Sequence, residues 1–234
     1  MMKQGSEKRI AAAALALLGL IGVIPTSAAG EPAPKPLRVA VLLYDGVEIL
    51  DVAGPLEVFT STTIEREGRQ ARAFEVYTVA ERSKPVTANN AGKTFLPDYT
   101  LASAPAPQIL IVPGGDTAGA EANRALLGWI QKISEGTEVT ASVCTGAFLL
   151  AKVGLLKGKP ATTHWYFLDR LAGEYPDVEV KRDVRFVDAG RVITSAGVSA
   201  GIDMALHVVE RYHGRDAARS TARVMQYESP PWWQ

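Results

Sequence analysis

The chain has 234 residues, of which 47% are hydrophobic and 21% are charged. This composition excludes a disordered chain, and the length allows one domain or at most two small ones. Lys plus Arg and Asp plus Glu both number 25, so no excess of basic charge argues for a nucleic-acid partner. The single cysteine excludes an internal disulfide and a paired-cysteine zinc or redox site, and we expect neither a metal nor an organic cofactor.

The N-terminus has the pattern of a secretory signal peptide. Lys3, Lys8 and Arg9 precede an uncharged apolar run over residues 10–24, and small residues follow at 27–29. These are the charged region, the apolar region and the cleavage site of such a signal. The apolar run is shorter than the roughly 20 residues of a comfortable membrane span. An uncleaved anchor helix is the alternative.

Cleavage of the segment 1–29 predicts a protein that is periplasmic or secreted and not attached to a membrane. Residues 30–36 contain three prolines and predict a short extended linker. We expect the folded domain to occupy residues 37–230.

The remaining chain alternates between strand and helix patterns. In chain order these patterns predict strand 37–44, helix 49–60, strand 73–79, strand 108–112, helix 118–134, strand 138–143, helix 145–156, strand 191–194, helix 199–212 and helix 216–225. Strands separated by helix-length segments imply βαβ units, so the predicted fold class is α/β with a mostly parallel sheet covered on both faces.

Three of the predicted strands are followed by unusual residues, at 44–51, 113–115 and 144–146. In parallel α/β folds, binding and catalytic sites form at the carboxyl ends of the strands. We therefore expect these three segments to converge on one site.

Residues 142–146, Ser-Val-Cys-Thr-Gly, predict a sharp turn between a strand and a helix. Such a turn brings the residues two before and two after its apex together, so both must be small, as Ser142 and Gly146 are. The apex thiol of Cys144 is then exposed above a helix N-terminus, which is expected to lower its pKa. A buried, inert cysteine is the alternative.

Gly114 and Gly115 follow a neighbouring strand, where their lack of a side chain allows close approach of backbone to ligand. Their N–H groups are candidates to stabilise the negative charge that a thiolate attack creates. An ordinary Pro-Gly-Gly turn is the alternative.

Asp51 lies at the start of the first predicted helix, with Pro55 in its first turn. It is a candidate proton carrier beside the thiol, and a helix cap is the alternative. Glu48 is a nearby rival that we expect to face solvent.

Two further polar residues are candidates for the site. Asp203 lies in an otherwise apolar helix, where a carboxylate needs a partner; we expect a structural bond to loop backbone or to His207. His164 begins a helix with Trp165 and Tyr166, and it is a candidate base whose alternatives are capping and packing.

These motifs resemble those of the DJ-1/PfpI superfamily. The resemblance covers about residues 37–230 and rests on the sequences at 44–55, 111–115, 142–146 and 161–165, and on Gly-Val-Ser-Ala-Gly-Ile-Asp at 197–203. Within the superfamily, the chain is most similar to the isonitrile hydratase branch and to the amidotransferase-like domains of AraC-type regulators. The resemblance implies a flavodoxin-like, class I glutamine amidotransferase-like three-layer sandwich that forms a homodimer.

The resemblance also implies roles for individual residues. Cys144 matches the nucleophile, Asp51 its acidic partner, and Thr145 the threonine that follows the cysteine in the hydratase branch. Gly114 or Gly115 matches the source of the oxyanion-hole amide.

Asp203 matches an acidic residue beside a mobile helix at the site of the hydratase branch. The family's peptidases have His where this chain has Thr145, and true glutamine amidotransferases carry a His-x-Glu pair that is missing here. We therefore expect neither peptidase nor glutaminase activity. The chain ends at Gln234, so we also expect no helix-turn-helix domain.

The sequence thus favours a cysteine-dependent hydratase or hydrolase of a small-molecule electrophile, most similar to isonitrile hydratase. In such an enzyme Cys144 attacks the isonitrile carbon, Asp51 relays protons, and water releases an N-substituted formamide. The alternative is a non-catalytic periplasmic module that binds a ligand or responds to oxidation.

Overall fold

The protein is described by a computed structural model that covers residues 35–89 and 92–227. The predicted signal peptide and most of the predicted linker lie outside these residues, so both stay predictions. The described residues all fall in one compact unit, Pro34–Gln234.

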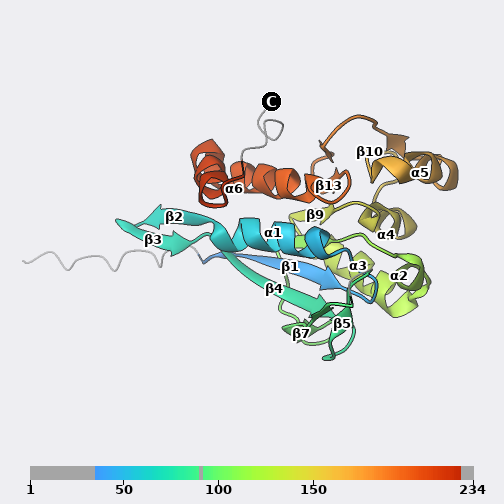
Figure 1. Ribbon diagram of the computed structural model, residues 1–234, viewed down its shortest axis with the longest axis horizontal. Helices are drawn as coiled ribbons and strands as arrows, with labels where there is room; N and C mark the ends of the chain where they lie inside the picture. The colour runs from blue at the N-terminus through green and yellow to red at the C-terminus, as the bar shows by residue number, and fades with distance from the viewer. Residues whose placement is uncertain (1–34, 90–91, 228–234) are drawn as a thin grey trace, which may run out of the picture. The chain divides into compact units, whose positions relative to one another are not determined.

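A seven-stranded sheet forms the centre of this unit (Figure 1). Its spatial order is β12-β13-β9-β8-β1-β4-β7, and every pair is parallel except β12 with β13. The strands are β1 Leu37–Leu43, β4 Phe74–Ala80, β7 Tyr99–Thr100, β8 Ile109–Val112, β9 Val139–Ser142, β12 Phe186–Asp188 and β13 Val192–Ser195. The predicted α/β class with a mostly parallel sheet is therefore confirmed.

The helices cover both faces of the sheet. They are α1 Ile49–Ser61, α2 Ala118–Ala122, α3 Arg124–Gly136, α4 Gly146–Lys152, α5 Leu168–Glu174 and α6 Ala200–Val224. The β1–α1–β4 connection runs toward one edge of the sheet, and the β8–α3–β9 connection runs toward the other. Because such crossovers are right-handed, opposite directions place α1 and α3 on opposite faces. Helix α6 packs against α1, and α4 against α3. Residues of β8 and β9 are buried because both faces of the sheet are covered.

The predicted single helix over 118–134 is wrong at Asn123. That residue has extended backbone (φ −83°, ψ 98°), and its side-chain oxygen accepts hydrogen bonds from the amides of Ala125 and Leu126. It therefore ends α2 and caps α3. The predicted break between 199–212 and 216–225 is present within α6, where Gly214 has non-helical backbone (φ 83°, ψ 166°).

Several short strands had no prediction. They are β2 Thr63–Arg66, β3 Arg69–Arg72, β5 Val86–Thr87, β6 Thr94–Phe95, β7, β10 Pro160–Ala161, β11 Glu179–Val180 and β12. All have only two to four residues, and β2 and β3 are largely polar, so neither an apolar run nor a clear alternation marks them. The β2–β3 hairpin projects from one end of the unit in Figure 1, away from α2 and α4.

No helix within the described residues is both long and apolar enough to cross a bilayer. Over the same part of the chain, no group of three or more His, Cys, Asp or Glu side chains is arranged to hold a metal ion.

The direction in which successive strands are added to the sheet reverses between β1 and β8, and in parallel α/β sheets ligand sites form at the carboxyl ends of the strands at such a point. There the hydroxyl of Tyr44 donates a hydrogen bond of 2.7 Å to the carbonyl of Pro113. Val47 forms an isolated bridge with Gly115. The amide of Gly115 also donates a hydrogen bond of 2.8 Å to the hydroxyl of Thr145, so the three segments singled out by the sequence analysis meet here, as predicted.

Candidate functional site

Cys144 occupies the apex of a strained turn between β9 and α4. Its backbone lies in the left-handed region (φ 56°), which is costly for a residue with a side chain. A Cβ atom on Gly146 would lie 2.2 Å from the carbonyl oxygen of Val112, so this position must be glycine. Ser142 is fully buried at the other end of the turn. The predicted elbow, with small residues on either side of its apex, is confirmed.

Residues from outside the turn hold the Cys144 backbone in this conformation. Its amide donates to the carbonyls of Ser195 and Ala196, at 3.2 Å each. Its carbonyl accepts a bond of 2.7 Å from the hydroxyl of Thr163. The prediction that its side chain is exposed is wrong, because only 6% of the residue is accessible to solvent.

Asp51 is completely buried in the first turn of α1. Its Oδ2 atom accepts a hydrogen bond of 2.9 Å from the amide of Gly114, 63 residues away in the chain. Its Oδ1 atom accepts none from any described residue. The N-cap position is occupied by Glu48, without a side-chain bond, so the capping alternative for Asp51 is wrong.

The two predicted oxyanion-hole amides are both occupied. The Gly114 amide donates to Asp51, and the Gly115 amide donates to the Oγ1 atom of Thr145 at 2.8 Å. The Thr145 hydroxyl in turn donates to the carbonyl of Gly115 at 2.9 Å. A Cβ atom on Gly114 would lie 2.6 Å from the Thr145 amide, so close approach does require glycine here. The two amides therefore donate to protein atoms and are not free to bind a ligand oxygen.

Burial governs the charge state of the two central groups. Desolvation raises the pKa of Asp51 to about 7; the Gly114 amide and the Cys144 thiol oppose this rise, and the charge of Glu48 adds to it. Desolvation, followed by the negative charge of Asp51, raises the pKa of Cys144 to about 12. The amides of Thr145 and Val198 and the Thr145 hydroxyl oppose that rise.

The expectation that the helix N-terminus lowers the thiol pKa is therefore wrong. Helix α4 has only seven residues, and its dipole acts against both the burial of the sulfur and a carboxylate beside it. The resting pair is a neutral Cys144 thiol next to Asp51, which is ionised above neutral pH.

This charge state predicts slow alkylation of the native protein. Below the thiol pKa, the rate of reaction with iodoacetamide follows the small thiolate fraction and should rise about tenfold per pH unit. We expect no plateau near the free-thiol value of about 8.5. Mass spectrometry of the single cysteine measures this rate. A plateau at or below that value would show that the thiol is activated at rest.

Asp203 does not face the thiol. It is fully buried in α6, where it accepts hydrogen bonds from Arg185 and from the hydroxyl of Tyr227. The expected structural role is supported, but the His207 partner is wrong, because His207 bonds to Asp188 instead.

His164 directly follows Thr163, whose hydroxyl bonds to the Cys144 carbonyl. Its Nδ1 atom accepts a hydrogen bond from the amide of Tyr166 and caps a short 3-10 helix, Trp165–Phe167. Its ring packs so closely on Gly197 that a Cβ atom there would lie 2.1 Å from the ring. Partial burial lowers the pKa of His164, so the ring is neutral at physiological pH. These contacts favour the capping and packing alternatives over a role as base.

Sequence reasoning assigned no role to two residues that contact the nucleophile. Thr163 holds the Cys144 carbonyl, and the Val198 amide acts on the sulfur. Val198 is a β-branched residue with its backbone in the left-handed region (φ 52°), a conformation that no local sequence pattern predicts. The motifs at 161–165 and 197–203 were the available signals.

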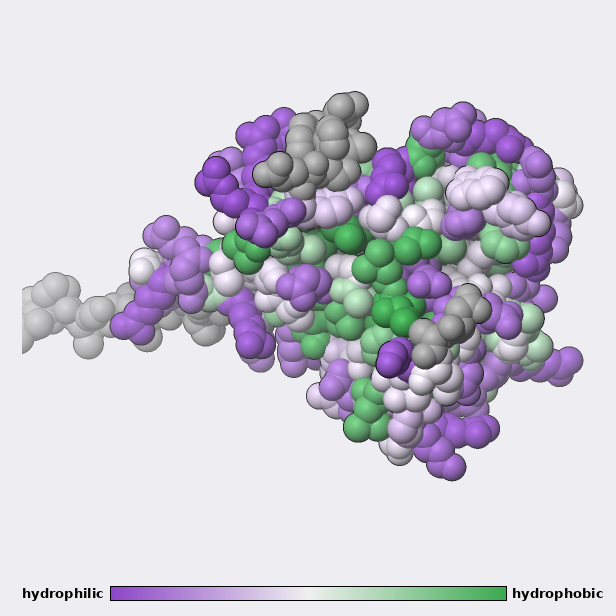
Figure 2. Space-filling model, in the orientation of Figure 1, coloured by the Kyte–Doolittle hydropathy of each residue, from purple (hydrophilic) through white to green (hydrophobic). Residues whose placement is uncertain are grey.

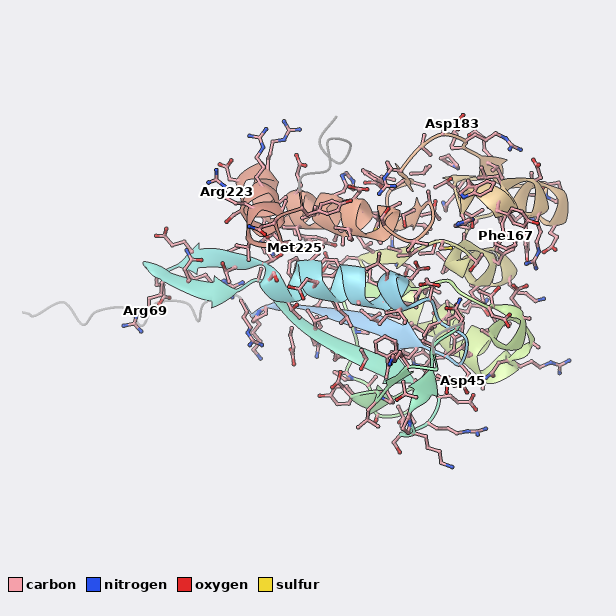
Figure 3. The ribbon with its side chains drawn as sticks, in the orientation of Figure 1. Asp45, Arg69, Phe167, Asp183, Arg223 and Met225 are labelled. Carbon is pink, nitrogen blue, oxygen red and sulfur yellow. The ribbon has the colours of Figure 1, made fainter. Side chains whose placement is uncertain are left out.

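A cavity of about 490 Å³ opens beside Thr145, on the side of the domain formed by α2, α4 and α5. Gly115, Phe167 and Arg170 also line it, and Figure 3 marks Phe167 at the start of α5. A second cavity, of about 360 Å³, lies beyond Tyr44 and includes Asp45, also labelled there. Neither is lined by Cys144 or Asp51.

The site has a buried thiol on a strained turn beside a buried carboxylate, at the carboxyl ends of a parallel sheet. These features define an α/β protein with a cysteine at a nucleophile elbow. The DJ-1/PfpI family model matches residues 37–211, and the chain belongs to this family.

Known proteins agree with this assignment. The chain is 31% identical to isonitrile hydratase of Pseudomonas putida, over 83% of this chain and 80% of that protein. It is 28% identical to the HTH-type transcriptional regulator GbdR of Pseudomonas aeruginosa, over 87% of this chain and 54% of the regulator. The crystal structure of a ThiJ/PfpI family protein from Pseudomonas syringae superposes with a TM-score of 0.74 at 30% identity, covering 84% of this chain and 77% of that one.

Proposed function

We propose that the protein is a cysteine-dependent hydratase that converts a small isonitrile and water to an N-substituted formamide. Cys144 is the nucleophile and Asp51 carries the protons. The similarity to isonitrile hydratase supports this substrate class.

The observation that carries the proposal is the occupied state of the two glycine amides. Thiol attack on an ester or amide creates an oxyanion, which needs free N–H donors. Here the amides of Gly114 and Gly115 already donate to Asp51 and Thr145. Attack on the terminal carbon of an isonitrile creates no oxyanion, because that carbon itself takes up a proton. The site is better suited to this reaction than to acyl transfer.

The steps balance without a further reactant. The S–H of Cys144 adds across the isonitrile carbon: sulfur bonds to the carbon, and the proton reaches the same carbon through Asp51. The product is a thioimidate. Water then adds to this carbon while Asp51 moves one of its protons to the nitrogen. Expulsion of the sulfur gives the formamide, and the remaining hydroxyl proton returns to the sulfur.

The charge state of the site fits this sequence. A thiol with a pKa of about 12 does not lose its proton before it attacks, so proton transfer to Asp51 accompanies formation of the S–C bond. The unpartnered Oδ1 atom of Asp51 is available to accept that proton. The small accessible area of Cys144 suits an isonitrile, because its reacting end is a single terminal carbon.

The direct test incubates the chain beginning at Gly30 with a simple alkyl isonitrile and follows the formamide by NMR. We expect a rate proportional to protein concentration. No formamide above the rate of buffer alone, with a folded protein, would contradict the proposal.

The second candidate function is a non-catalytic module that binds a ligand or responds to oxidation. The raised pKa of the Cys144 thiol favours it, because a protein without turnover does not need an activated nucleophile. Similarity to the regulator GbdR also favours it. Ligand-dependent stabilisation without formamide formation would support this candidate.

We also propose that the protein is exported and forms a homodimer. Export rests on the signal pattern ending at Ala29, and an intact Met1 in cytoplasmic protein would contradict it. The dimer rests on the family resemblance and on half-buried apolar residues of α1, namely Ile49, Leu50 and Leu56. Figure 2 shows hydrophobic residues gathered where α1 and the first half of α6 lie. Sedimentation of the purified protein tests the dimer.

A further inference from the structure

We propose that Arg185 is a positioning residue for the nucleophile: it holds the segment 196–199 against Cys144 by bonding to both of its ends. This inference rests on the proposed role of Cys144 as the reacting group. Arg185 precedes β12 and touches neither the thiol nor Asp51 in any described hydrogen bond.

Arg185 reaches the segment through its backbone and its side chain. Its carbonyl accepts a hydrogen bond of 2.9 Å from the amide of Ala196. Its guanidinium donates through Nη2 to the hydroxyl of Ser199 at 3.1 Å, and through Nε to Oδ2 of Asp203 at 2.6 Å. One residue therefore ties both ends of the segment to the first turn of α6.

The anchor of this arrangement is a buried carboxylate. Asp203 is completely buried, and its ion pair with Arg185 compensates the charge. Its second oxygen accepts a hydrogen bond of 3.0 Å from the hydroxyl of Tyr227. Because Asp203 is fixed on two sides, the planar guanidinium is held in an orientation in which Nη2 reaches both Asp203 and the hydroxyl of Ser199.

The held segment is strained and directly contacts the nucleophile. Val198 has φ 52°, a conformation that a β-branched residue keeps only when its surroundings impose it. The carbonyls of Ser195 and Ala196 accept the Cys144 amide, and the Val198 amide faces the sulfur. Release of the segment would move this amide away from the sulfur.

Packing restrains the segment and the first turn of α6 that follows it. A Cβ atom on Gly197 would lie 2.1 Å from the His164 ring, and one on Gly201 would lie 2.8 Å from the Val143 side chain. The His164 ring leaves Gly197 little space, and the bonds from Arg185 hold the two ends of the segment. Arg185 therefore determines whether the Val198 amide stays at the thiol.

The test is Arg185→Lys, which keeps the positive charge but replaces the planar fork with a single ammonium group. We expect the rate of Cys144 alkylation at mildly alkaline pH to fall by roughly tenfold, the effect of losing one hydrogen bond to a charged sulfur. Iodoacetamide and the bulkier N-ethylmaleimide should slow by the same factor, because the thiolate fraction changes rather than access to the thiol. Arg182→Lys is the matched control, because Arg182 pairs with exposed Asp169 and should leave both rates unchanged.

Unchanged alkylation in folded Arg185→Lys would overturn the proposal, as would a gain for the bulky reagent over the small one. If Arg185→Lys does not fold, Ser199→Ala replaces it. This variant removes only the bond between Arg185 and the hydroxyl of residue 199. We expect it to slow alkylation by both reagents equally, and by less than Arg185→Lys. Unchanged rates with both reagents would overturn the proposal. Alkylation does not depend on isonitrile turnover. The positioning role of Arg185 can therefore be supported in a protein without hydratase activity, and it can be overturned in an active hydratase.

Discussion

Cys144→Ala is expected to lower kcat/KM for formamide formation by roughly 10³-fold or more, the scale seen when an enzyme nucleophile is removed. Without the sulfur no thioimidate forms, and the carboxylate alone cannot bond covalently to the isonitrile carbon. NMR of the formamide product, in the same assay as for the wild type, measures the loss. The thermal midpoint should change little, because removal of one sulfur atom leaves only a small cavity.

Cys144→Ser provides the second arm of this experiment. The hydroxyl has a higher pKa than the thiol, and the same burial would raise it further, so the variant should be as inactive as Cys144→Ala. Turnover in either folded variant within about tenfold of the wild type would remove the covalent mechanism. The proton carrier Asp51 would then have to activate water directly.

Asp51→Asn is expected to reduce turnover by roughly 10²-fold or more, because the amide cannot accept the thiol proton. The asparagine oxygen can still accept the Gly114 bond, so the local structure should persist. In the wild type, activity should fall about tenfold per pH unit below pH 7, as Asp51 becomes protonated. A profile that is flat through neutral pH would contradict the assignment of Asp51 as the base.

The same variant should be more stable than the wild type in alkaline solution. The folded-state pKa of Asp51, about 7, lies above the ordinary carboxyl value near 3.9, so the folded state binds the proton more tightly than the unfolded state. The free energy of unfolding therefore falls as pH rises between these two values, by at most about 4 kcal/mol, and Asp51→Asn removes this loss. Urea unfolding on both sides of neutral pH measures the effect. Equal stability of the two proteins in alkaline solution would show that the carboxylate is not destabilising.

Glu48→Gln is the matched control for both measurements. Glu48 is a neighbouring acid whose charge raises the pKa of Asp51. Its replacement should keep turnover and move the acidic limb of the pH profile to lower pH. Loss of turnover in Glu48→Gln with retention in Asp51→Asn would exchange the roles of the two acids.

A gain in stability with a loss of turnover would explain why an unpaired carboxylate occupies this position. Burial makes Asp51 a stronger base than an ordinary carboxylate, and the same burial makes its charge costly to the fold. Its one amide partner, Gly114, compensates only part of this cost and leaves Oδ1 available. A residue selected only for capping would have both oxygens bonded or exposed.

Local pattern was sufficient wherever the backbone follows from short-range chemistry. The apolar run of β1, the small residues around Cys144 and the glycine at 214 each act within a few residues, and the strand, the elbow and the break in α6 were predicted correctly. The prediction was wrong at Asn123, because its side chain caps the helix that follows and the residues before it form a separate short helix. The edge strand β12 was missed because three residues carry too little pattern.

The sequence by itself determined the fold class, the family and the meeting of Cys144, Asp51 and Gly114 at one end of the sheet, since strand ends and turn chemistry are local properties. Only the tertiary structure decided the charge state of the thiol, because desolvation depends on how deeply the packed elements bury the sulfur. It also decided that the glycine amides are occupied, by partners 63 and 30 residues away in the chain. Hydrogen-bond partners at that separation are set by how the strands and helices pack, and no local pattern contains them.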